Sequence, residues 1–466
     1  MHALLLQGFF LEDAMDAGML LPIFSLPSPS GRGDFSQVEA YLNFLRAAGF
    51  SYWQILPINP VDAYMSPYAS PDLSAGDLLL LDVGALKKEG FVSSAKEVPY
   101  EKKIAALCSN LNLRKTEDCP CFQDFMEEKG EEAVAAGLFY SAMGRYGHFR
   151  HWPAEVKKDF PGFRDAHKGD RAVRIYCALS YLFEKQWRKI LNYAEACGIE
   201  IVGDLPYYPG IDSVERWIHP EHFLLDDDLE PTYVSGVPGD DFSDEGQLWN
   251  SPVYDWKALA AEDFAYFRKR IDAALSRYHR LRLDHFRGYE KIYHIPRGEK
   301  PAAGHWESVP GEALFSPWKE DKRFLIEDLG FLDEDFHRFR DKFPWPGMRV
   351  MALEGPSRAS ERPQIYYTGN HDTDPLPLYV KHMDEKTKRL WEDAMGAEVS
   401  TENLLNDAVC RREETVFFQH GDFLENPGRI NRPGTCRGNW QWMLPPDAMN
   451  EDAAKRIELC LKERAK

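Results

Sequence analysis

The chain has 466 residues, and 44% of them are hydrophobic, which is enough for a large core. Lys and Arg number 56 against 75 Asp and Glu, giving a formal net charge of −19. A surface this acidic repels nucleic acid and anionic membranes, so these partners are excluded and a neutral or small-molecule partner is expected.

The N-terminal segment, residues 1–16, contains an apolar run without a basic region before it, which argues against a secretory signal peptide. No apolar run is long enough to span a bilayer. The eight cysteines are scattered, and only Cys119 and Cys121 are close together, so reduced thiols are favoured over a zinc site or a disulfide framework. We therefore expect a cytoplasmic protein, while its oligomeric state stays open.

Eight short apolar segments, separated by segments of helical periodicity, predict a (β/α)8 barrel, in an α/β fold that spans residues 1–466 as one catalytic domain. Several of these segments end in Gly, Asp or His, as strands do where they meet a loop. The predicted strands are GMLLPIFSL (18–26), SYWQILPI (51–58), IEIVGDLP (199–206), RLRLDHF (280–286), RFLIEDLG (323–330), GMRVMAL (347–353), QIYYTGNHD (364–372) and ETVFFQ (414–419).

Two long stretches interrupt this alternation. Residues 86–170 are rich in Lys and Glu, show helical periodicity and are too long for a loop, which predicts an inserted and mostly helical subdomain. Residues 207–265 predict a second insertion of loop and helix, in which GVPGDDFSDEGQLWNSPVYDW (236–256) is expected to be loop. An amphipathic helix is expected over 447–466 and leaves no room for a C-terminal β-domain.

Polar residues gather where the predicted strands end, and in a barrel these positions face one mouth. Carboxylates crowded together raise one another's pKa and destabilise the fold, so their convergence indicates a function. The candidates at strand ends are Asp204, Arg282, Asp284, Glu327, Asp328, His371 and Asp372.

Two of these carboxylates fit the roles that retaining glycoside chemistry needs. Arg282 lies two residues before Asp284 on the same face, and we expect its guanidinium to keep that carboxylate ionised, as a nucleophile requires. Glu327 follows three apolar residues, which predicts desolvation and a raised pKa, as a general acid requires. Retaining enzymes hold two such groups about 5 Å apart. Asp372 beside His371 is expected to bind sugar hydroxyls.

A metal site is the alternative reading, because His and Asp at strand ends are ligands in many barrel enzymes. The sequence has no His-x-His motif, and Arg282 beside the supposed ligand disfavours a cation, so we predict no metal. Twelve Trp and twenty-one Tyr favour sugar, whose C–H faces stack on aromatic rings. Tyr68, Trp249 and Trp256 are expected in loops at the mouth, whereas Trp53, inside a strand, is expected in the core.

Six motifs of the chain are RLRLDHFRG, LIEDLG, YYTGNHDTD, IVGDLPYY, GQLWNSPVY and RINRPGTCRGNWQW. Together they resemble a known family, the 4-α-glucanotransferases of the amylomaltase (disproportionating enzyme) type. This is glycoside hydrolase family 77 of the α-amylase clan. The resemblance runs from about residue 25 to residue 444, so it covers nearly the whole chain.

The resemblance implies that Asp284 is the nucleophile, Glu327 the acid/base and Asp372 the carboxylate that stabilises the transition state. It implies a double displacement on maltooligosaccharides and α-1,4-glucans, and no cofactor. Residues 207–265 would form the acceptor-side loop. The implied substrate-binding residues are Tyr68, Asp204, Asp240, Gln247, Trp249, Arg282 and His371.

Several loop positions depart from the family pattern, whereas the three carboxylates are kept. Ala69 replaces a Gln, Thr373 replaces an Asn, and Asp241 replaces an aromatic residue. Two other functions therefore stay open beside the transferase: an α-glucan hydrolase that uses the same residues, and a non-catalytic glucan-binding protein.

Overall fold

A computed structural model describes residues 16–239, 245–330, 332–356, 362–411 and 415–462. Eight parallel strands follow one another in the order β10-β11-β12-β1-β2-β3-β6-β9. The Ile326 amide donates a 3.0 Å hydrogen bond to the Pro346 carbonyl, which joins β9 to the residue before β10 and closes the ring. The predicted (β/α)8 barrel is thus confirmed. Its strands are β1 (Ala17–Leu20), β2 (Tyr52–Gln54), β3 (Glu200–Leu205), β6 (Arg280–Leu283), β9 (Phe324–Ile326), β10 (Gly347–Val350), β11 (Gln364–Tyr367) and β12 (Val416–Gln419).

Each predicted strand overlaps an observed one, but the observed strands are shorter. After β1, for example, Pro22 has no amide hydrogen for the ladder, and the chain turns into a 3-10 helix over Ile23–Ser25. Strand β6 shows the predicted alternation: Leu281 and Leu283 are fully buried against the outer helices, while Arg282 belongs to the interior side. An apolar cluster fills much of the rest of the interior, with Val202, Leu325 and their neighbours on other strands.

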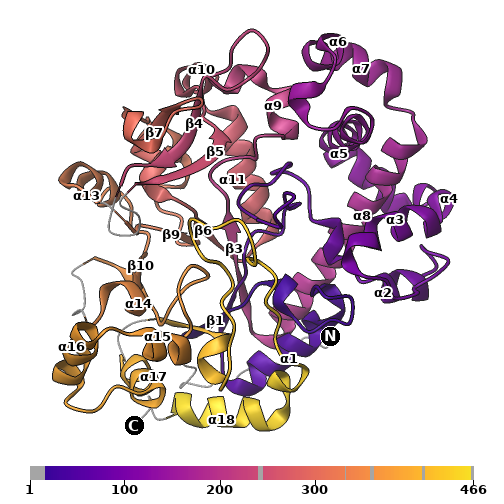
Figure 1. Ribbon diagram of the computed structural model, residues 1–466. Coiled ribbons are helices and arrows are strands. Elements are labelled where there is room, and N and C mark those ends of the chain that lie inside the picture. Colours follow the sequence, from indigo (N-terminus) through magenta and orange to yellow (C-terminus); the bar gives the residue numbers. More distant parts are fainter. Residues whose placement is uncertain (1–15, 240–244, 331, 357–361, 412–414, 463–466) are drawn as a thin grey trace, which may run out of the picture.

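Helices fill the long stretch between β2 and β3 and lie on one side of the barrel (Figure 1). The two longest, α5 and α8, pack against each other. Gly137 of α5 permits this close approach, because a Cβ there would lie 3.1 Å from a methyl carbon of Val173. The helices are α2 (Val83–Lys88), α3 (Tyr100–Asn110), α4 (Leu113–Glu117), α5 (Pro120–Tyr146), α6 (Ala154–Lys158), α7 (Phe160–His167) and α8 (Arg171–Cys197). The helical character predicted for 86–170 is observed and continues to Cys197.

A second sheet lies beside the barrel and was not predicted. It has four antiparallel strands in the order β5-β4-β7-β8: β4 (Tyr233–Val237), β5 (Gln247–Pro252), β7 (Lys291–Pro296) and β8 (His305–Ser308). The expectation that 236–256 is loop was wrong for β5. The many Gly, Pro and Asp residues there obscure the alternation of apolar and polar residues that predicts a strand. The pairing register of β4 and β5 also shifts between Val234 and Gly236, as in a β-bulge.

The remaining helices surround the barrel: α1 (Val38–Ala48), α9 (Val214–Ile218), α10 (Trp256–Ala261), α11 (Ala265–Arg277), α12 (Gly311–Phe315), α13 (Glu334–Arg340), α14 (Met351–Glu354), α15 (Leu376–His382), α16 (Glu385–Met395), α17 (Thr401–Val409) and α18 (Glu451–Lys462). The predicted amphipathic helix near the C-terminus is α18, which buries Ile457 and Leu461 and packs against α1 (Figure 1). Among the described residues, none of the helices has the length and apolarity needed to cross a bilayer.

Candidate active site

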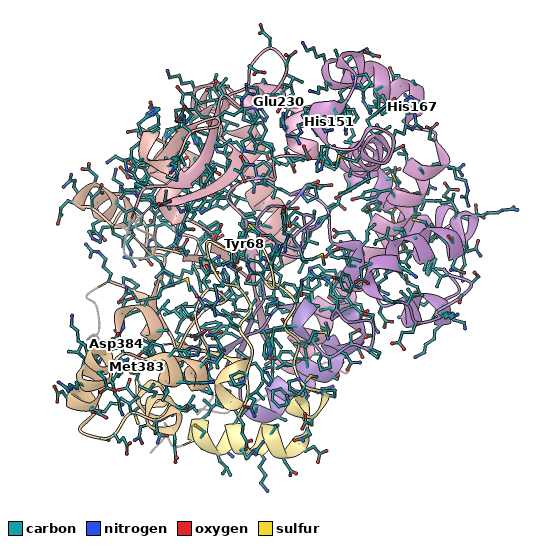
Figure 2. All side chains as sticks on the ribbon, viewed as in Figure 1. Tyr68, His151, His167, Glu230, Met383 and Asp384 are labelled. Carbon is teal, nitrogen blue, oxygen red and sulfur yellow. The ribbon has the colours of Figure 1, made fainter. Side chains whose placement is uncertain are left out.

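A cavity of about 910 Å³ opens at the carboxyl ends of the barrel strands. It collects most of the predicted site residues, since Tyr68, Gln247, Trp249, Arg282, Asp284, Glu327, His371 and Asp372 all line it. Tyr68 lies near the middle of the molecule, where the barrel meets its inserted segments (Figure 2). Asp204 is buried beneath this cavity, and Asp240 lies outside the described residues.

Backbone hydrogen bonds fix Asp284 and Glu327 next to each other. The Glu327 amide donates to the Leu283 carbonyl (3.0 Å), and the Phe286 amide donates to the Glu327 carbonyl (3.0 Å). The backbone hydrogen bonds between the chains of β6 and β9 therefore continue beyond the strand ends, before and after Asp284. The two carboxylates leave neighbouring strands at the same level, as the sequence analysis expected for residues at consecutive strand ends.

The backbone amide of His285 binds the Glu327 carboxylate. Its backbone is left-handed, with φ of 46°, which turns the chain sharply after Asp284. In this conformation the His285 amide donates a 2.8 Å hydrogen bond to Glu327 Oε2, and the Leu329 amide reaches Oε1 at 3.3 Å. Burial raises the pKa of Glu327, while Arg282 and these amides act in the opposite direction. The pKa of this carboxyl is thus shifted in the predicted direction.

Arg282 lies at the centre of the charge network. It lowers the pKa of Asp284, but less than the sequence analysis expected. One of its nitrogens, Nη1, lies 2.7 Å from both oxygens of Asp204 and 3.1 Å from Asp284 Oδ1. Burial raises the pKa of Asp284 to about 8, and the negative charges of Asp204 and Glu327 add to this effect. Arg282 opposes the rise, yet its charge is shared with Asp204.

The same network explains why Asp204 and Tyr68 belong to the site. Asp204 sits at the end of β3 with its side chain fully buried, and it accepts a 2.6 Å hydrogen bond from the Tyr68 hydroxyl. Arg282 occupies the position between the carboxylates that a metal ion would need, which disfavours cation binding here. Arg282 is thus the cation that contacts both Asp204 and Asp284.

Asp372 follows β11 on the opposite side of the cavity and is held by groups that the sequence analysis did not single out. Asn431 Nδ2 donates to Asp372 Oδ1 at 2.5 Å, and Arg429 donates to the Asp372 carbonyl. Asp372 Oδ2 lies 3.5 Å from His371 Nε2. Both Arg429 and Asn431 belong to the RINRPGTCRGNWQW motif, so the motif was noticed but its two contributing residues were not.

Aromatic rings form one wall of the cavity. The Tyr68 ring stacks on the His371 ring with centroids 5.1 Å apart, and Trp440 lies 5.9 Å from each of them. Trp440 comes from the same motif and was also missed. Of the other aromatic residues expected at the mouth, Trp256 is buried beside Phe267 instead, whereas Trp53 is in the core as predicted.

On the facing wall, β5 presents Trp249 and Gln247. Trp249 is 37% exposed, donates a 3.1 Å hydrogen bond to Gln247 Oε1 and packs its ring against His285 at a centroid distance of 4.9 Å. Because His285 follows Asp284 directly, this contact brings the Trp249 ring close to the carboxylate pair. Trp306 of β8 also lines this side, and no sequence signal pointed to it.

A parallel (β/α)8 barrel with buried carboxylates and aromatic walls at its mouth defines a carbohydrate-active barrel enzyme. The family described as 4-alpha-glucanotransferase matches residues 21–449, and the chain belongs to this family. It is 35% identical to a 4-alpha-glucanotransferase of Aquifex aeolicus (strain VF5), an alignment that covers 92% of this chain and 96% of the relative. It is 31% identical to the one of Thermus thermophilus, with 94% and 97% covered.

The fold agrees with this assignment. The solved structure of an amylomaltase from Streptococcus agalactiae in complex with acarbose matches with a TM-score of 0.87 at 28% identity, covering 97% of this chain and 99% of that one. The amylomaltase from Corynebacterium glutamicum matches with a TM-score of 0.75 at 16% identity, over 97% and 75% of the two chains, and supports the fold alone.

Proposed function

We propose that this protein is a 4-α-glucanotransferase that moves α-1,4-glucan segments between maltooligosaccharides by a retaining double displacement. The observation that carries the proposal is the pairing of Asp284 with Glu327 at neighbouring strand ends, under a cavity walled by aromatic rings. Two adjacent buried carboxyl groups of raised pKa can share a single proton, and this chemistry needs one acid and one carboxylate.

In the first step Asp284 Oδ attacks the anomeric carbon of the donor, and the bond to the leaving oxygen breaks. Glu327 gives its proton to that oxygen, which leaves as the 4-hydroxyl of the released sugar. In the second step Glu327, now a carboxylate, takes the proton of an acceptor 4-hydroxyl. The acceptor oxygen attacks the glycosyl-enzyme, so an α-1,4 bond is rebuilt and Asp284 is released.

The residues around the carboxyl pair are proposed to bind the glucan or to position the two carboxylates. Asp372, oriented by Asn431, is proposed to bind sugar hydroxyls and to stabilise positive charge near the anomeric carbon. Arg282 and Asp204 position Asp284, and Tyr68 with His371 offers rings for a sugar on the donor side. Gln247 and Trp249, with Asp240 on the same inserted segment, are proposed to contact the acceptor.

The substrates would be neutral glucans, among them maltose-derived oligosaccharides and the outer chains of starch or glycogen. Residues 207–265 would serve as the acceptor-side insertion, and 86–170 as a helical subdomain. All eight cysteines are free, which supports a reducing compartment such as the cytoplasm.

Incubation of the purified protein with maltotriose alone, in the presence of chelator, tests this function. Separation by chain length should give glucose together with a ladder of longer oligosaccharides. Glucose and maltose alone would mean hydrolysis, in which water replaces the acceptor. If maltotriose and then maltoheptaose both stay unchanged while the protein still binds them, the transferase assignment is wrong and a binding protein is left.

A further inference from the structure

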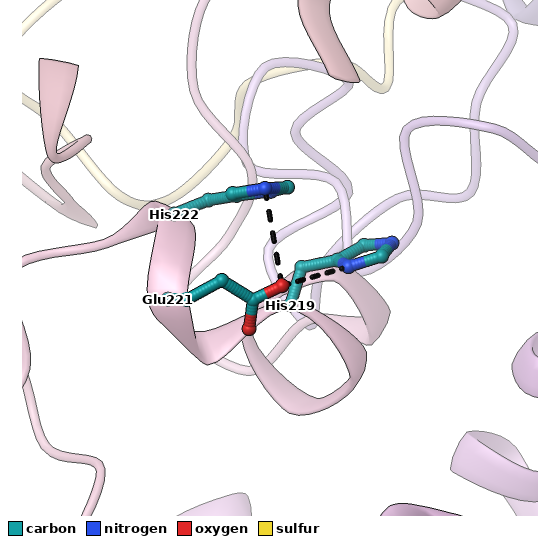
Figure 3. Close-up of side chains that lie close together, drawn as sticks. All are labelled: His219, Glu221 and His222. Carbon is teal, nitrogen blue, oxygen red and sulfur yellow. Dashed lines mark hydrogen bonds and ion pairs between the residues drawn. The ribbon is translucent and has the colours of Figure 1, made fainter. Parts of the chain in front are cut away.

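A second cluster of polar side chains lies outside the cavity, on the segment that follows α9. His219, Glu221 and His222 each offer one ligand atom, and these three atoms lie within 4.8 Å of one another (Figure 3). The segment reads His-Pro-Glu-His, and its 3-10 helix over Pro220–His222 folds both rings toward the same carboxylate. The proposed glucan chemistry uses none of these residues.

The separations suit a transition metal. Glu221 Oε1 lies 3.2 Å from His219 Nδ1 and 3.9 Å from His222 Nε2. Ligand atoms of a tetrahedral zinc ion, with bonds of about 2.0–2.1 Å, lie about 3.3 Å apart. A fourth group, Glu262 at the end of α10, approaches the same imidazole, with its Oε1 3.2 Å from His222 Nε2. Two imidazoles and two carboxylates are a donor set that zinc accepts.

His222 is the buried member of the cluster. Its side chain is 5% exposed, and its Nδ1 is buried without a hydrogen-bond partner among the described residues. The ion would bind at Nε2, the nitrogen that faces Glu221 and Glu262. His219 and Glu221 are largely exposed, so an ion can enter from solvent.

We propose that His219, Glu221 and His222 form a binding site for a divalent transition-metal ion of the zinc type, with Glu262 within reach as a further ligand. The ion would sit between Glu221 Oε1 and the two ring nitrogens and would replace direct His–Glu contacts by metal bonds. The site is separate from the carboxylates at the barrel mouth, and it does not depend on the proposed transferase function.

The site would join two pieces of the inserted segment, the ligands at 219–222 and Glu262 after α10. The His222 carbonyl accepts a 2.8 Å hydrogen bond from the Asp255 amide, and Leu224 donates to the Val253 carbonyl at 3.0 Å. Residues 253–255 directly follow β5, the strand that carries Trp249. Through Glu262, which follows α10, a bound ion would fasten this part of the chain to the segment 219–222, and the role is structural.

The test uses the full chain without a histidine tag, stripped with chelator and dialysed. Titration with Zn²⁺ in a calorimeter should show one saturable site per chain, and binding should raise the melting temperature. Replacement of an exposed ligand, His219→Gln or Glu221→Gln, should weaken Zn²⁺ binding by at least about tenfold. Both variants keep a side chain of similar polarity on the surface, so the chain should still fold.

His305→Gln is the matched control, because His305 is an exposed histidine that pairs with a single carboxylate, Glu307, at 3.4 Å. Its affinity for Zn²⁺ should stay within about twofold of the unchanged chain. Hydrogen exchange should also slow over 219–224 and 253–262 when Zn²⁺ is added. The proposal is overturned if the unchanged chain shows no saturable binding, or if both ligand variants bind Zn²⁺ as tightly as the control does.

Discussion

Asp284 combines a proposed chemical role with a cost in stability. Replacement by Asn keeps its size but removes the nucleophilic oxygen, so transfer from maltotriose should fall by about a thousandfold or more. Measurement of kcat/KM for maltotriose, with maltotriose affinity determined in parallel, checks this. Retained affinity with lost turnover is expected, whereas unchanged turnover would remove Asp284 from the mechanism.

The same substitution should stabilise the fold at alkaline pH. The folded-state pKa of Asp284 is raised to about 8, far above its ordinary value, so the folded state binds a proton that the unfolded state releases. Stability is then lost as pH rises from about 4 towards about 8. Asp284→Asn should remove this loss.

Thermal unfolding at pH 5, 6, 7 and 8 checks the stability change. The melting temperature of Asp284→Asn should exceed that of the unchanged chain by a margin that widens with pH. Asp228→Asn, at a carboxylate that is 84% exposed, is the control and should follow the unchanged chain. A margin that stays constant with pH would contradict the raised pKa.

The carboxyl pair also predicts a bell-shaped pH dependence of the reaction. Both pKa values are raised, and the charge of Glu327 contributes to the rise at Asp284, so the active form holds one proton between the two groups. Activity should fall below the lower apparent pKa of the pair, and again above about pH 8, where the shared proton is lost. A profile of kcat/KM against pH from 4 to 10 measures both limbs. Constant activity up to pH 10 would contradict this assignment.

At the scale of elements, β5 should set how well an acceptor competes with water. Trp249→Ala removes a ring that borders the cavity beside His285, so acceptor binding should weaken by about three- to tenfold, as expected for an aromatic contact of about 0.5–1.5 kcal/mol. The ratio of glucose released by hydrolysis to glucan transferred should rise accordingly. Product analysis with and without an added glucose acceptor measures this ratio.

Two further variants make the Trp249 result specific. Trp249→Phe keeps an aromatic ring and should restore most of the transfer, while Leu390→Ala, an exposed apolar residue on α16, should change nothing. An unchanged ratio in Trp249→Ala would show that β5 does not contact the acceptor.

Helix α9 holds the loop that carries Tyr68 through Glu215. Glu215 Oε1 accepts a 2.7 Å hydrogen bond from the Leu73 amide, and burial with repulsion from Asp72 raises the pKa of Glu215 to about 8. Its folded-state pKa is thus above the unfolded one, and stability should fall as pH rises towards 8. Glu215→Gln keeps the acceptor without the charge and should be more stable than the unchanged chain at pH 8.

Glu215→Ala is the contrasting variant. It removes the acceptor and leaves the buried Leu73 amide without a partner, which should destabilise the fold by about 1–3 kcal/mol. Urea unfolding at pH 6 and pH 8 separates the two effects. Equal stability of the Gln and Ala variants would mean that the hydrogen bond contributes nothing.

Sequence patterns predicted the elements with local signals and missed those that depend on distant partners. The eight barrel strands are recognisable in the sequence as apolar runs that end in polar residues. Asp284, Glu327 and Asp372 could be predicted as site residues because they lie at these strand ends. Strand β5 could not be predicted in the same way, because its pairing with β4 is set by a register shift across residues rich in Gly, Pro and Asp. The pKa of Asp284 could not be predicted from the sequence either, because it depends on Asp204, which lies on another strand and also binds Arg282.

At the scale of the whole molecule, the net charge of −19 should not influence catalysis. Neutral glucans gain nothing from long-range steering, and the charges around the carboxylates are buried, where salt screens them little. The kcat/KM for maltotriose should stay within about twofold between low and physiological ionic strength and up to 0.5 M NaCl. A steep salt dependence would instead indicate a charged substrate.

The sheet of β5, β4, β7 and β8 draws its strands from two different connections of the barrel. Strands β4 and β5 come from the connection between β3 and β6, while β7 and β8 come from the one between β6 and β9. Neither connection can be exchanged alone without leaving the edge of the other unpaired. Grafting a relative's specificity onto this scaffold would therefore require transplanting both connections together, as a single cassette.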